Sequence, residues 1–371
     1  MAEETTFRPG LEGVIAAETE ISWLDVDHEQ IVLRGYDLLE LAQKCPYLSV
    51  AHLLIAGRLP DKEELTALEQ EIAQETPLPQ PVVDILAKLP RTAHPMDLLR
   101  TGLSALGPFD PDLEDHSSEA TWRQSIRVLA RVPQIIATGW RLQQEEPIVE
   151  NDPKLGYSAN FLYSITGKRP TQTEAAAFDE LLAVYSEHEL PNSTFAAIVV
   201  ASTLTDLYSA LVAGVASLKG PLHGGANEAV MHMLIEAKTP DGLERLILDK
   251  LAAKERIMGF GHRVYMHKMD PRAQLMKTAL HQLVAGTPHE GLFDLCVRGE
   301  EVMHREKGLY PNLDYYAAPV YYVLGVPIPL YTPIFFAART AGLLAHIREQ
   351  YAHNRLFRPR VRYIGPQGLH L

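Results

Sequence analysis

The chain has few cysteines, no excess of positive charge and none of the short motifs that hold phosphate or zinc. Among 371 residues only Cys45 and Cys296 are cysteines, and they form no Cys-x-x-Cys pair. A disulfide framework and a cysteine zinc site are therefore not expected, and we predict a reducing, cytoplasmic location. Lysine and arginine number 34 against 47 acidic residues, so the net charge is −13. This balance argues against nucleic acid or an anionic membrane as a partner.

Neither a Walker-type loop nor a His-Glu-x-x-His sequence occurs, although the chain has 15 histidines. We therefore predict no metal site and no phosphate-binding loop. The first residues lack an apolar stretch, which argues against a signal peptide. The run from Phe195 to Leu218 is apolar and long enough to cross a bilayer, but Asp206 lies near its middle. We expect a single helix there, buried in a core or at an interface.

Hydrophobic periodicity favours helices through most of the chain. The clearest helical patterns cover Tyr36–Cys45, Ser49–Ala56, Lys62–Gln74, Pro81–Lys88, Glu119–Gln143, Glu174–Glu187 and Asp241–Lys254. The exception is Thr19–Arg34, where apolar residues flank the acidic turn Asp25-Val26-Asp27 and predict a small β hairpin. The sequence thus predicts an all-α protein with an N-terminal hairpin. The chain of 371 residues is longer than a typical single domain with one small hydrophobic core. We expect residues 1–223 and 326–371 to form a large domain and the more polar region 224–325 a small one.

Three short segments place ionisable side chains in breaks between helical runs. They are Gly220-Pro221-Leu222-His223-Gly224-Gly225, Gly259-Phe260-Gly261-His262-Arg263 and Tyr310-Pro311-Asn312-Leu313-Asp314-Tyr315. Breaks rich in glycine and proline let the backbone approach a ligand and leave side chains free for acid and base work. His223 also precedes a helix expected over Asn227–Ala237, whose N-terminal dipole disfavours an imidazolium ion. Together the segments predict an active site.

In this order and at these separations the segments resemble the citrate synthase family. The similarity runs from Gly10-Leu11-Glu12-Gly13 to Arg358-Pro359-Arg360, so it covers essentially the whole chain. The resemblance implies an almost wholly helical homodimer with two domains in each subunit and sites completed across the interface. It also implies an acyltransferase that condenses acetyl-CoA with oxaloacetate and hydrolyses the thioester to citrate and CoA. Both small molecules are substrates, and no cofactor is implied.

The resemblance assigns three catalytic roles. His223 stabilises the enolate oxygen, Asp314 is the base on the methyl group, and His262 is the acid toward the carbonyl of oxaloacetate. A thioester α-CH is a weaker acid than an aspartic acid by roughly 15 pK units, which amounts to about 20 kcal/mol. A carboxylate alone cannot supply this, so the developing enolate needs a preorganised donor.

Oxaloacetate carries two carboxylates, which guanidinium groups match in geometry. By similarity His188, Arg272, Arg339 and Arg358 bind it, with Arg358 offered to the partner subunit. The candidate CoA contacts are Arg263, Lys268 and Arg355. His262 and Arg272 lie ten positions apart, one more than is usual in the family, so Met266 takes the place of a basic residue and Lys268 substitutes for it.

Two alternatives stay open. A 2-methylcitrate synthase would use propionyl-CoA in the same site, and one methylene discriminates by only about 1–3 kcal/mol. A non-catalytic helical binding protein would keep the fold without the chemistry. Loss of Asp314 or of a clamp arginine would have favoured that second alternative, and none is missing.

Overall fold

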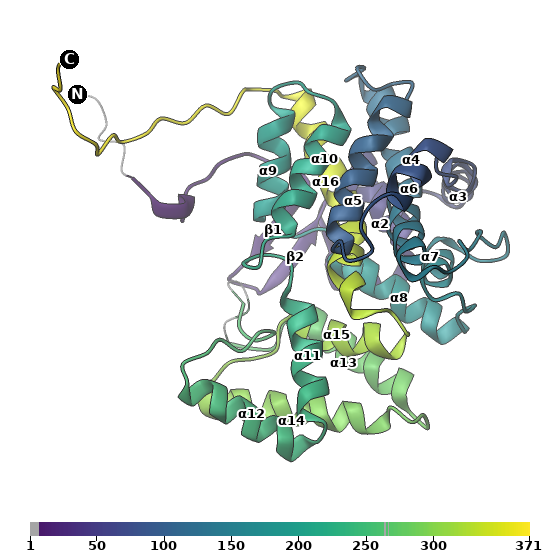
Figure 1. Cartoon of the computed structure of the whole chain (residues 1–371), viewed down its shortest axis with the longest axis vertical. Helices are drawn as coiled ribbons and strands as arrows, with labels where there is room; N and C mark the ends of the chain where they lie inside the picture. The colour runs from purple at the N-terminus through teal and green to yellow at the C-terminus, as the bar shows by residue number, and fades with distance from the viewer. Residues whose placement is uncertain (1–6, 263–264, 266) are drawn as a thin grey trace.

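The computed structural model describes residues 7–262, 265 and 267–371 and is mostly helical, which confirms the all-α prediction (Figure 1). The helices are α1 Leu38–Lys44, α2 Tyr47–Ala56, α3 Lys62–Glu75, α4 Gln80–Ala87, α5 Pro95–Leu106, α6 Ser118–Gln144, α7 Tyr157–Thr166, α8 Gln172–Tyr185, α9 Asn192–Ala201, α10 Leu207–Leu218, α11 Ala226–Ala237, α12 Pro240–Ala252, α13 Pro271–Val284, α14 Glu290–Lys307, α15 Leu313–Val323 and α16 Tyr331–Ala352. Short 3₁₀ segments cover Pro9–Leu11, Gly107–Phe109 and Ile328–Leu330.

The N-terminal hairpin is present and carries one more strand than predicted. β1 (Ser22–Asp25), β2 (Gln30–Leu33) and β3 (Tyr36–Asp37) form an antiparallel sheet in that order. Tyr36 pairs with Leu33, so the helix expected from Tyr36 begins two residues later. The Asp37 side chain accepts hydrogen bonds from the amides of the first turn of α1, which is why the helix starts there.

The prediction of a single helix over Phe195–Leu218 is wrong. The chain breaks after α9, passes through Leu204 with a φ of 60°, and starts again at α10. The Asp206 carboxylate accepts a hydrogen bond from the amide of Ser209 at 2.8 Å and so caps the new helix. Asp206, which we expected to lie inside one helix, is therefore the residue that caps the start of α10. The two helices α9 and α10 pack side by side (Figure 1).

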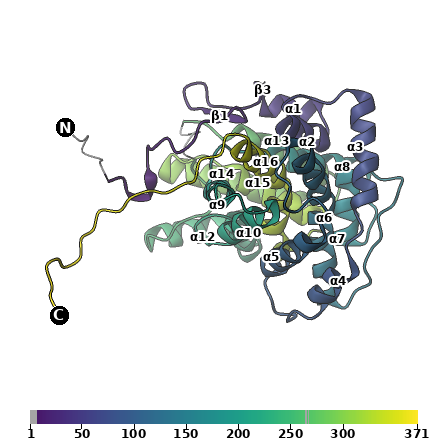
Figure 2. The same ribbon diagram turned by 90° about the horizontal axis from the view of Figure 1, so that it is seen from above.

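α16 passes through the middle of the molecule and forms much of its core (Figures 1 and 2). Ile328–Ala352 is the one stretch of the described chain long and apolar enough to cross a membrane, and 89% of its most apolar window is buried inside the protein. It packs against α2, α6, α8, α9 and α10. Such burial is typical of a central core helix.

Helices α11 to α15 gather at one end of the molecule (Figure 1). Within this group α13 packs on α15, α12 packs on α14, and α11 contacts both α12 and α15. The group meets the rest of the chain through contacts of α13 and α15 with α8 and of α11 with α16. All three motif segments lie at or beside this junction.

Candidate active site

The segments that carry His262 and Asp314 are joined backbone to backbone. The amide of Gly261 donates to the carbonyl of Tyr310, and the amide of Asn312 donates to the carbonyl of Gly259, each at 2.9 Å. Gly259 has a φ of +87°, and a Cβ there would lie 2.6 Å from a methyl group of Val230. Only glycine fits this position without strain. Two loops about fifty residues apart in sequence are thus fixed against each other.

Asp314 is the second residue of α15 and keeps part of its surface open. Its amide donates to the Asn312 side chain at 3.1 Å, which caps the helix. Its Oδ1 accepts a hydrogen bond from the hydroxyl of Tyr185 at 2.7 Å. Burial raises the pKa of Asp314 above its usual value, while the Tyr185 hydroxyl and the nearby Arg272 work to lower it. A carboxylate with a raised pKa is a better base.

His223 lies in the turn just before α11, half-buried against Ser193. Its Nε2 accepts a hydrogen bond from the amide of Ser193 at 3.2 Å and lies 2.9 Å from the Ser193 hydroxyl. Burial, with a contribution from Arg339, lowers the pKa of His223 to about 4, and the ring is therefore neutral at pH 7. Because Nε2 is an acceptor, the proton of the neutral ring is on Nδ1.

His188 and His262 lie edge to face with ring centroids 5.1 Å apart. The Nε2 of His262 lies 3.3 Å from Nη2 of Arg272. Burial, followed by Arg272, lowers the pKa of His262 to about 4 and that of His188 well below its usual value. The Nε2 of His188 is buried and has no hydrogen-bond partner among the described residues. A buried, unpaired ring nitrogen points to a ligand that would pair with it.

Arg272 and Arg339, the two buried arginines predicted to bind oxaloacetate, are held in place by different contacts. Arg272 makes a two-pronged pair with Asp270, at 3.1 Å from Nε and 2.8 Å from Nη2. Arg339 donates from Nε to the carbonyl of Tyr185 at 2.7 Å and lies over the ring of Phe335. Burial lowers the pKa of Arg339 to about 10, so the guanidinium stays charged at neutral pH.

These side chains share one electrostatic environment. Arg339 shifts the pKa values of His188, His223 and Asp314. Arg272 shifts the pKa values of His188, His262 and Asp314. The structure thus brings the predicted enolate donor His223, the predicted acid His262 and the predicted base Asp314 into one region. The predicted clamp of His188 and two arginines lies in the same region.

The other predicted residues lie elsewhere. Arg358 is exposed, and no hydrogen bond or ion pair joins it to another described residue of this chain. Arg355 is exposed beyond the end of α16. Lys268 pairs with Glu29 at 2.8 Å, beside a cavity of about 300 Å³ between the sheet and α13. Arg263 lies outside the described residues.

Sequence reasoning missed the polar residues that support the site. Tyr185, Glu187 and Asp270 are buried beside the predicted groups. Glu187 accepts a hydrogen bond from Ser22 at 2.9 Å, and one of its oxygens lies where a Cβ on Gly342 would be. The signal for Asp270 was its place directly before Pro271-Arg272, where it caps α13 and pairs with the arginine. Tyr185 carried no signal, because an aromatic residue at the end of an apolar helix is typical of a core.

The arrangement suits proton abstraction from a carbon acid beside an anionic second substrate. A carboxylate, neutral imidazoles and two fixed guanidinium groups meet there. No group of three or more metal-ligating side chains occurs in the part of the chain that the structure describes.

The chain is similar to known proteins along nearly its whole length. Residues 10–360 match the family model described as citrate synthase, C-terminal domain. A Bacillus subtilis protein named citrate/2-methylcitrate synthase is 56% identical over 368 residues, covering 99% of each chain. A citrate synthase of Heyndrickxia coagulans is 54% identical over 369 residues, covering 100% of this chain and 99% of that relative.

Solved structures of similar proteins share the fold. Citrate synthase from Pyrobaculum aerophilum superposes with a TM-score of 0.91 at 35% identity, covering 98% of this chain and 93% of the other. The ternary complex of carboxymethyl coenzyme A and oxaloacetate with citrate synthase from Thermoplasma acidophilum superposes with a TM-score of 0.92 at 29% identity. That match covers 99% of this chain and 98% of the other.

Proposed function

Since the chain belongs to the citrate synthase family, we propose that it joins the methyl carbon of acetyl-CoA to the keto carbon of oxaloacetate and then releases citrate and CoA. The enzyme is an acyltransferase in which the acyl group becomes an alkyl group on transfer. The observation that carries the proposal is the meeting of Asp314, the neutral His223 and the charged Arg339 in one environment. These are the groups that a thioester enolisation beside a dianion requires.

In the first step the Asp314 carboxylate takes a proton from the methyl group while His223 donates a hydrogen bond to the thioester oxygen. A neutral imidazole is suited to this because it offers one N–H without placing a full positive charge beside Arg339. Burial makes both contributions stronger than they would be in water. The two groups together supply what the carboxylate alone lacks.

In the second step the enolate carbon attacks the keto carbon of oxaloacetate, and the keto oxygen takes up a proton through His262. The proton that Asp314 took from the methyl group replaces it, so both side chains return to their starting state. His262 lies beside Arg272 and His188, the side chains that we propose to hold oxaloacetate. Attack of water on the resulting thioester then breaks the C–S bond and releases CoA. No step transfers an electron, so we propose that the enzyme uses no cofactor.

Among the residues that the structure describes, the fixed charges leave the proposed oxaloacetate site short of cations. Arg272 and Arg339 face three buried or half-buried carboxylates, Asp270, Glu187 and Asp314. His188, His223 and His262 are neutral because their pKa values are lowered, so they add no positive charge. A dianion would meet a slightly negative environment, which would bind it weakly. A further cation is needed.

We propose that Arg358 of a second copy supplies that cation in a homodimer. The C-terminal segment after His353 and the N-terminal segment leave the body on the same side (Figures 1 and 2). They carry apolar side chains that their own chain leaves open, with Ile15, Val361 and Ile364 all about nine-tenths exposed. Exposed apolar segments of this kind are typical of subunit contacts.

We further propose that residues 224–325 form a small domain that closes on the site. Support comes from the packing of α11 to α15 on each other and from the position of His262 and Asp314 on this group. Arg263, Lys268 and Arg355 stay candidates for CoA contacts. To bind a CoA phosphate, Lys268 would have to give up its ion pair with Glu29.

We propose the cytoplasm as the location of the protein. Cys45 and Cys296 are both free thiols, which fits that reducing compartment.

Propionyl-CoA is a second candidate substrate, because a relative that is 56% identical is named citrate/2-methylcitrate synthase. The experiment that tests both is thiol release from acetyl-CoA and from propionyl-CoA, measured with and without oxaloacetate. We expect oxaloacetate-dependent release with at least one thioester. No release from either would contradict the proposed function, and the ratio of the two kcat/KM values gives the preference.

A further inference from the structure

One hydroxyl group touches the candidate base and has no assigned role. Tyr185 is the last residue of α8, and its side chain is 2% exposed. Its hydroxyl donates to Oδ1 of Asp314 at 2.7 Å, a short hydrogen bond between groups 129 residues apart in sequence. Hydrogen bonds to an ionised acceptor are about twice as strong as neutral ones.

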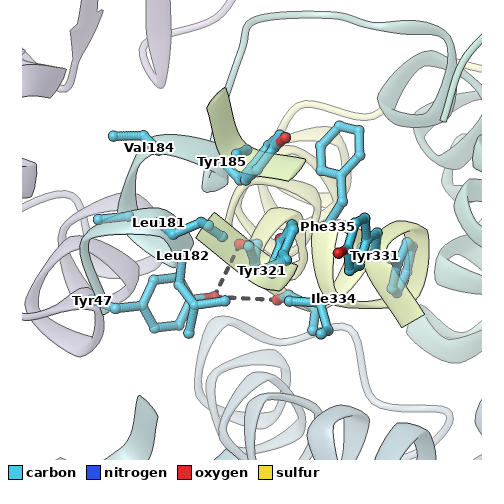
Figure 3. Packing of buried hydrophobic residues seen from close by; sticks show 14 of the residues in the cluster. Tyr47, Leu181, Leu182, Val184, Tyr185, Tyr321, Tyr331, Ile334 and Phe335 are labelled. Atoms are coloured by element: carbon cyan, nitrogen blue, oxygen red, sulfur yellow. Dashed lines mark hydrogen bonds between the residues drawn. The ribbon is translucent and has the colours of Figure 1, made fainter. Parts of the chain in front are cut away.

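The backbone of the same residue holds the oxaloacetate clamp. The carbonyl of Tyr185 accepts the hydrogen bond from Nε of Arg339 at 2.7 Å. The ring packs against Phe335, with centroids 4.6 Å apart, and Figure 3 shows both in the cluster around α16. Tyr185 is therefore bonded to the base through its side chain and to the clamp through its main chain.

The hydrogen bond leaves one face of the carboxylate available. Oδ1 of Asp314 is occupied by the hydroxyl, whereas Oδ2 makes no hydrogen bond to the residues that the structure describes. Proton abstraction requires a carboxylate oxygen free of other donors. The hydroxyl thus determines which oxygen can meet the substrate.

The surroundings of Tyr185 keep its hydroxyl a donor. Burial and then Asp314 raise the pKa of Tyr185 well above its usual value, so the phenol stays protonated. Asn227 has a smaller effect that lowers this pKa, and it does not reverse the rise.

We propose that Tyr185 is a positioning residue for the enolisation step, holding the Asp314 carboxylate ionised with Oδ2 turned toward the methyl group of the thioester. The inference rests on the proposed function. During the transfer Oδ2 gains the methyl proton, the C–H electron pair stays on carbon, and the phenol keeps its own proton. Nothing is oxidised or reduced.

Other charged and titratable groups also face Asp314 and stay the same when the phenol is altered. They are Arg272 of α13, Arg339 of α16, Asp270 before α13 and Tyr321 of α15. The two arginines lower the pKa of Asp314, and Asp270 raises it. A change in the pH profile of a Tyr185 variant therefore reports on the hydroxyl alone.

The test is Tyr185→Phe, compared with the control Tyr331→Phe. Tyr331 is a buried tyrosine of the same cluster whose hydroxyl has no hydrogen-bond partner among the described residues (Figure 3). For Tyr185→Phe we expect kcat to fall about 10- to 100-fold, the rate equivalent of one hydrogen bond to a charge. KM for oxaloacetate should stay within about two-fold, because the clamp is held by the backbone. The acid limb of kcat/KM should move to higher pH, since a group that lowers the pKa of the base is lost. Tyr331→Phe should change none of these.

Unchanged kcat and an unmoved acid limb in Tyr185→Phe would overturn the inference while leaving the proposed function intact. Absence of thiol release from the wild type would overturn the proposed function and this inference with it. Folding is checked by the rise in melting temperature that oxaloacetate causes. If Tyr185→Phe does not show this rise, the variant is not correctly folded, and a variant with a fluorinated tyrosine at position 185 is tested in its place. Its more acidic phenol is a stronger donor, so the acid limb should move to lower pH, and an unmoved limb would again overturn the inference.

Discussion

At the scale of single residues, environment decides the chemistry of groups that are ordinary in isolation. His223 illustrates this, because burial and Arg339 hold its pKa at about 4. We predict that the ring of His223 titrates near that value in the folded protein and not near 6.5. Histidine NMR spectra recorded against pH, assigned with His223→Gln, would measure it. A His223 signal that titrates between pH 6 and 7 would show that the ring is charged when it should donate as a neutral group.

The same lowered pKa has a consequence for stability. The folded pKa lies below the unfolded value, so the unfolded chain binds more protons as the pH falls from 6.5 toward 4. The contribution of His223 is fully present above pH 6.5 and is lost as the pH falls through that window. His223→Gln should therefore reduce the acid sensitivity of the melting temperature, and an unchanged slope would contradict the assignment.

Asp314 carries the second prediction at this scale. Asp314→Asn removes the base and should lower kcat by about 100- to 10,000-fold. Oxaloacetate binding, measured by calorimetry, should persist because the arginines and His188 are untouched. Turnover near the wild-type rate would remove Asp314 from its proposed role.

The Asn variant should also be more stable at neutral pH. Burial raises the folded pKa of Asp314, so ionisation costs stability as the pH rises through that folded value. The uncharged amide avoids this cost, and the difference in melting temperature from the wild type should shrink toward low pH.

The residues that we propose to be catalytic could be predicted from the sequence, whereas the residues that support them could not. His223, His262 and Asp314 stand in breaks rich in glycine and proline, where core packing does not explain them. Tyr185 lies at the end of an apolar helix, and its partner is 129 residues away. No local pattern encodes a hydrogen bond between such distant segments, so only the fold shows it.

At the scale of elements, the pairing of two loops places the base beside the proposed acid. Gly259 sits where a Cβ would meet a methyl group of Val230 and the ring of Tyr315. We predict that Gly259→Ala destabilises the protein by about 1–2 kcal/mol or more, the cost of a left-handed conformation plus the clash. Activity should fall more than global stability suggests, because the strand-like pairing with Tyr310 and Asn312 is disturbed.

Gly286→Ala is the matched control for this change. Gly286 also has a positive φ, of 67°, but a Cβ there meets nothing within 4 Å. It should cost stability without lowering kcat. For both variants kcat is measured by thiol release and stability by thermal unfolding. If both variants change kcat equally, the loop pairing does not position the site.

The break between α9 and α10 shows where reasoning about elements failed. Apolar composition across Phe195–Leu218 predicted one helix, and the capping role of Asp206 was not recognised. An aspartate in an apolar run can be a polar residue inside one continuous helix or the N-cap of a new helix. Hydrophobic periodicity alone does not distinguish these two cases. Capping boxes also open α3 at Asp61–Glu64 and α8 at Thr171–Glu174, and there a proline directly precedes the capping residue.

At the scale of the whole molecule, we expect the site to need a second copy of the chain. Arg358→Ala should weaken oxaloacetate binding, and mixtures of Arg358→Ala with Asp314→Asn subunits test the sharing. In a mixed dimer one site would have both its own Asp314 and the partner's intact arginine. After the two variants are dissociated, mixed and reassembled, we expect the mixture to be more active than either variant homodimer alone. No recovery in dimers shown to be mixed would contradict the sharing of the site.

The central claim is that His223 and Asp314 act on opposite ends of one acyl group. The most direct test is a crystal structure of the enzyme with oxaloacetate and carboxymethyl coenzyme A, the pair present in the complex of the Thermoplasma acidophilum relative. We predict His223 Nδ1 within about 3 Å of the oxygen that stands for the thioester carbonyl. We predict Oδ2 of Asp314 within hydrogen-bond reach of the other oxygen of the same carboxylate, which stands for the reacting methyl group, with one proton shared between the two carboxylates. A complex in which either residue lies outside the cavity that holds the acyl analogue would contradict the account.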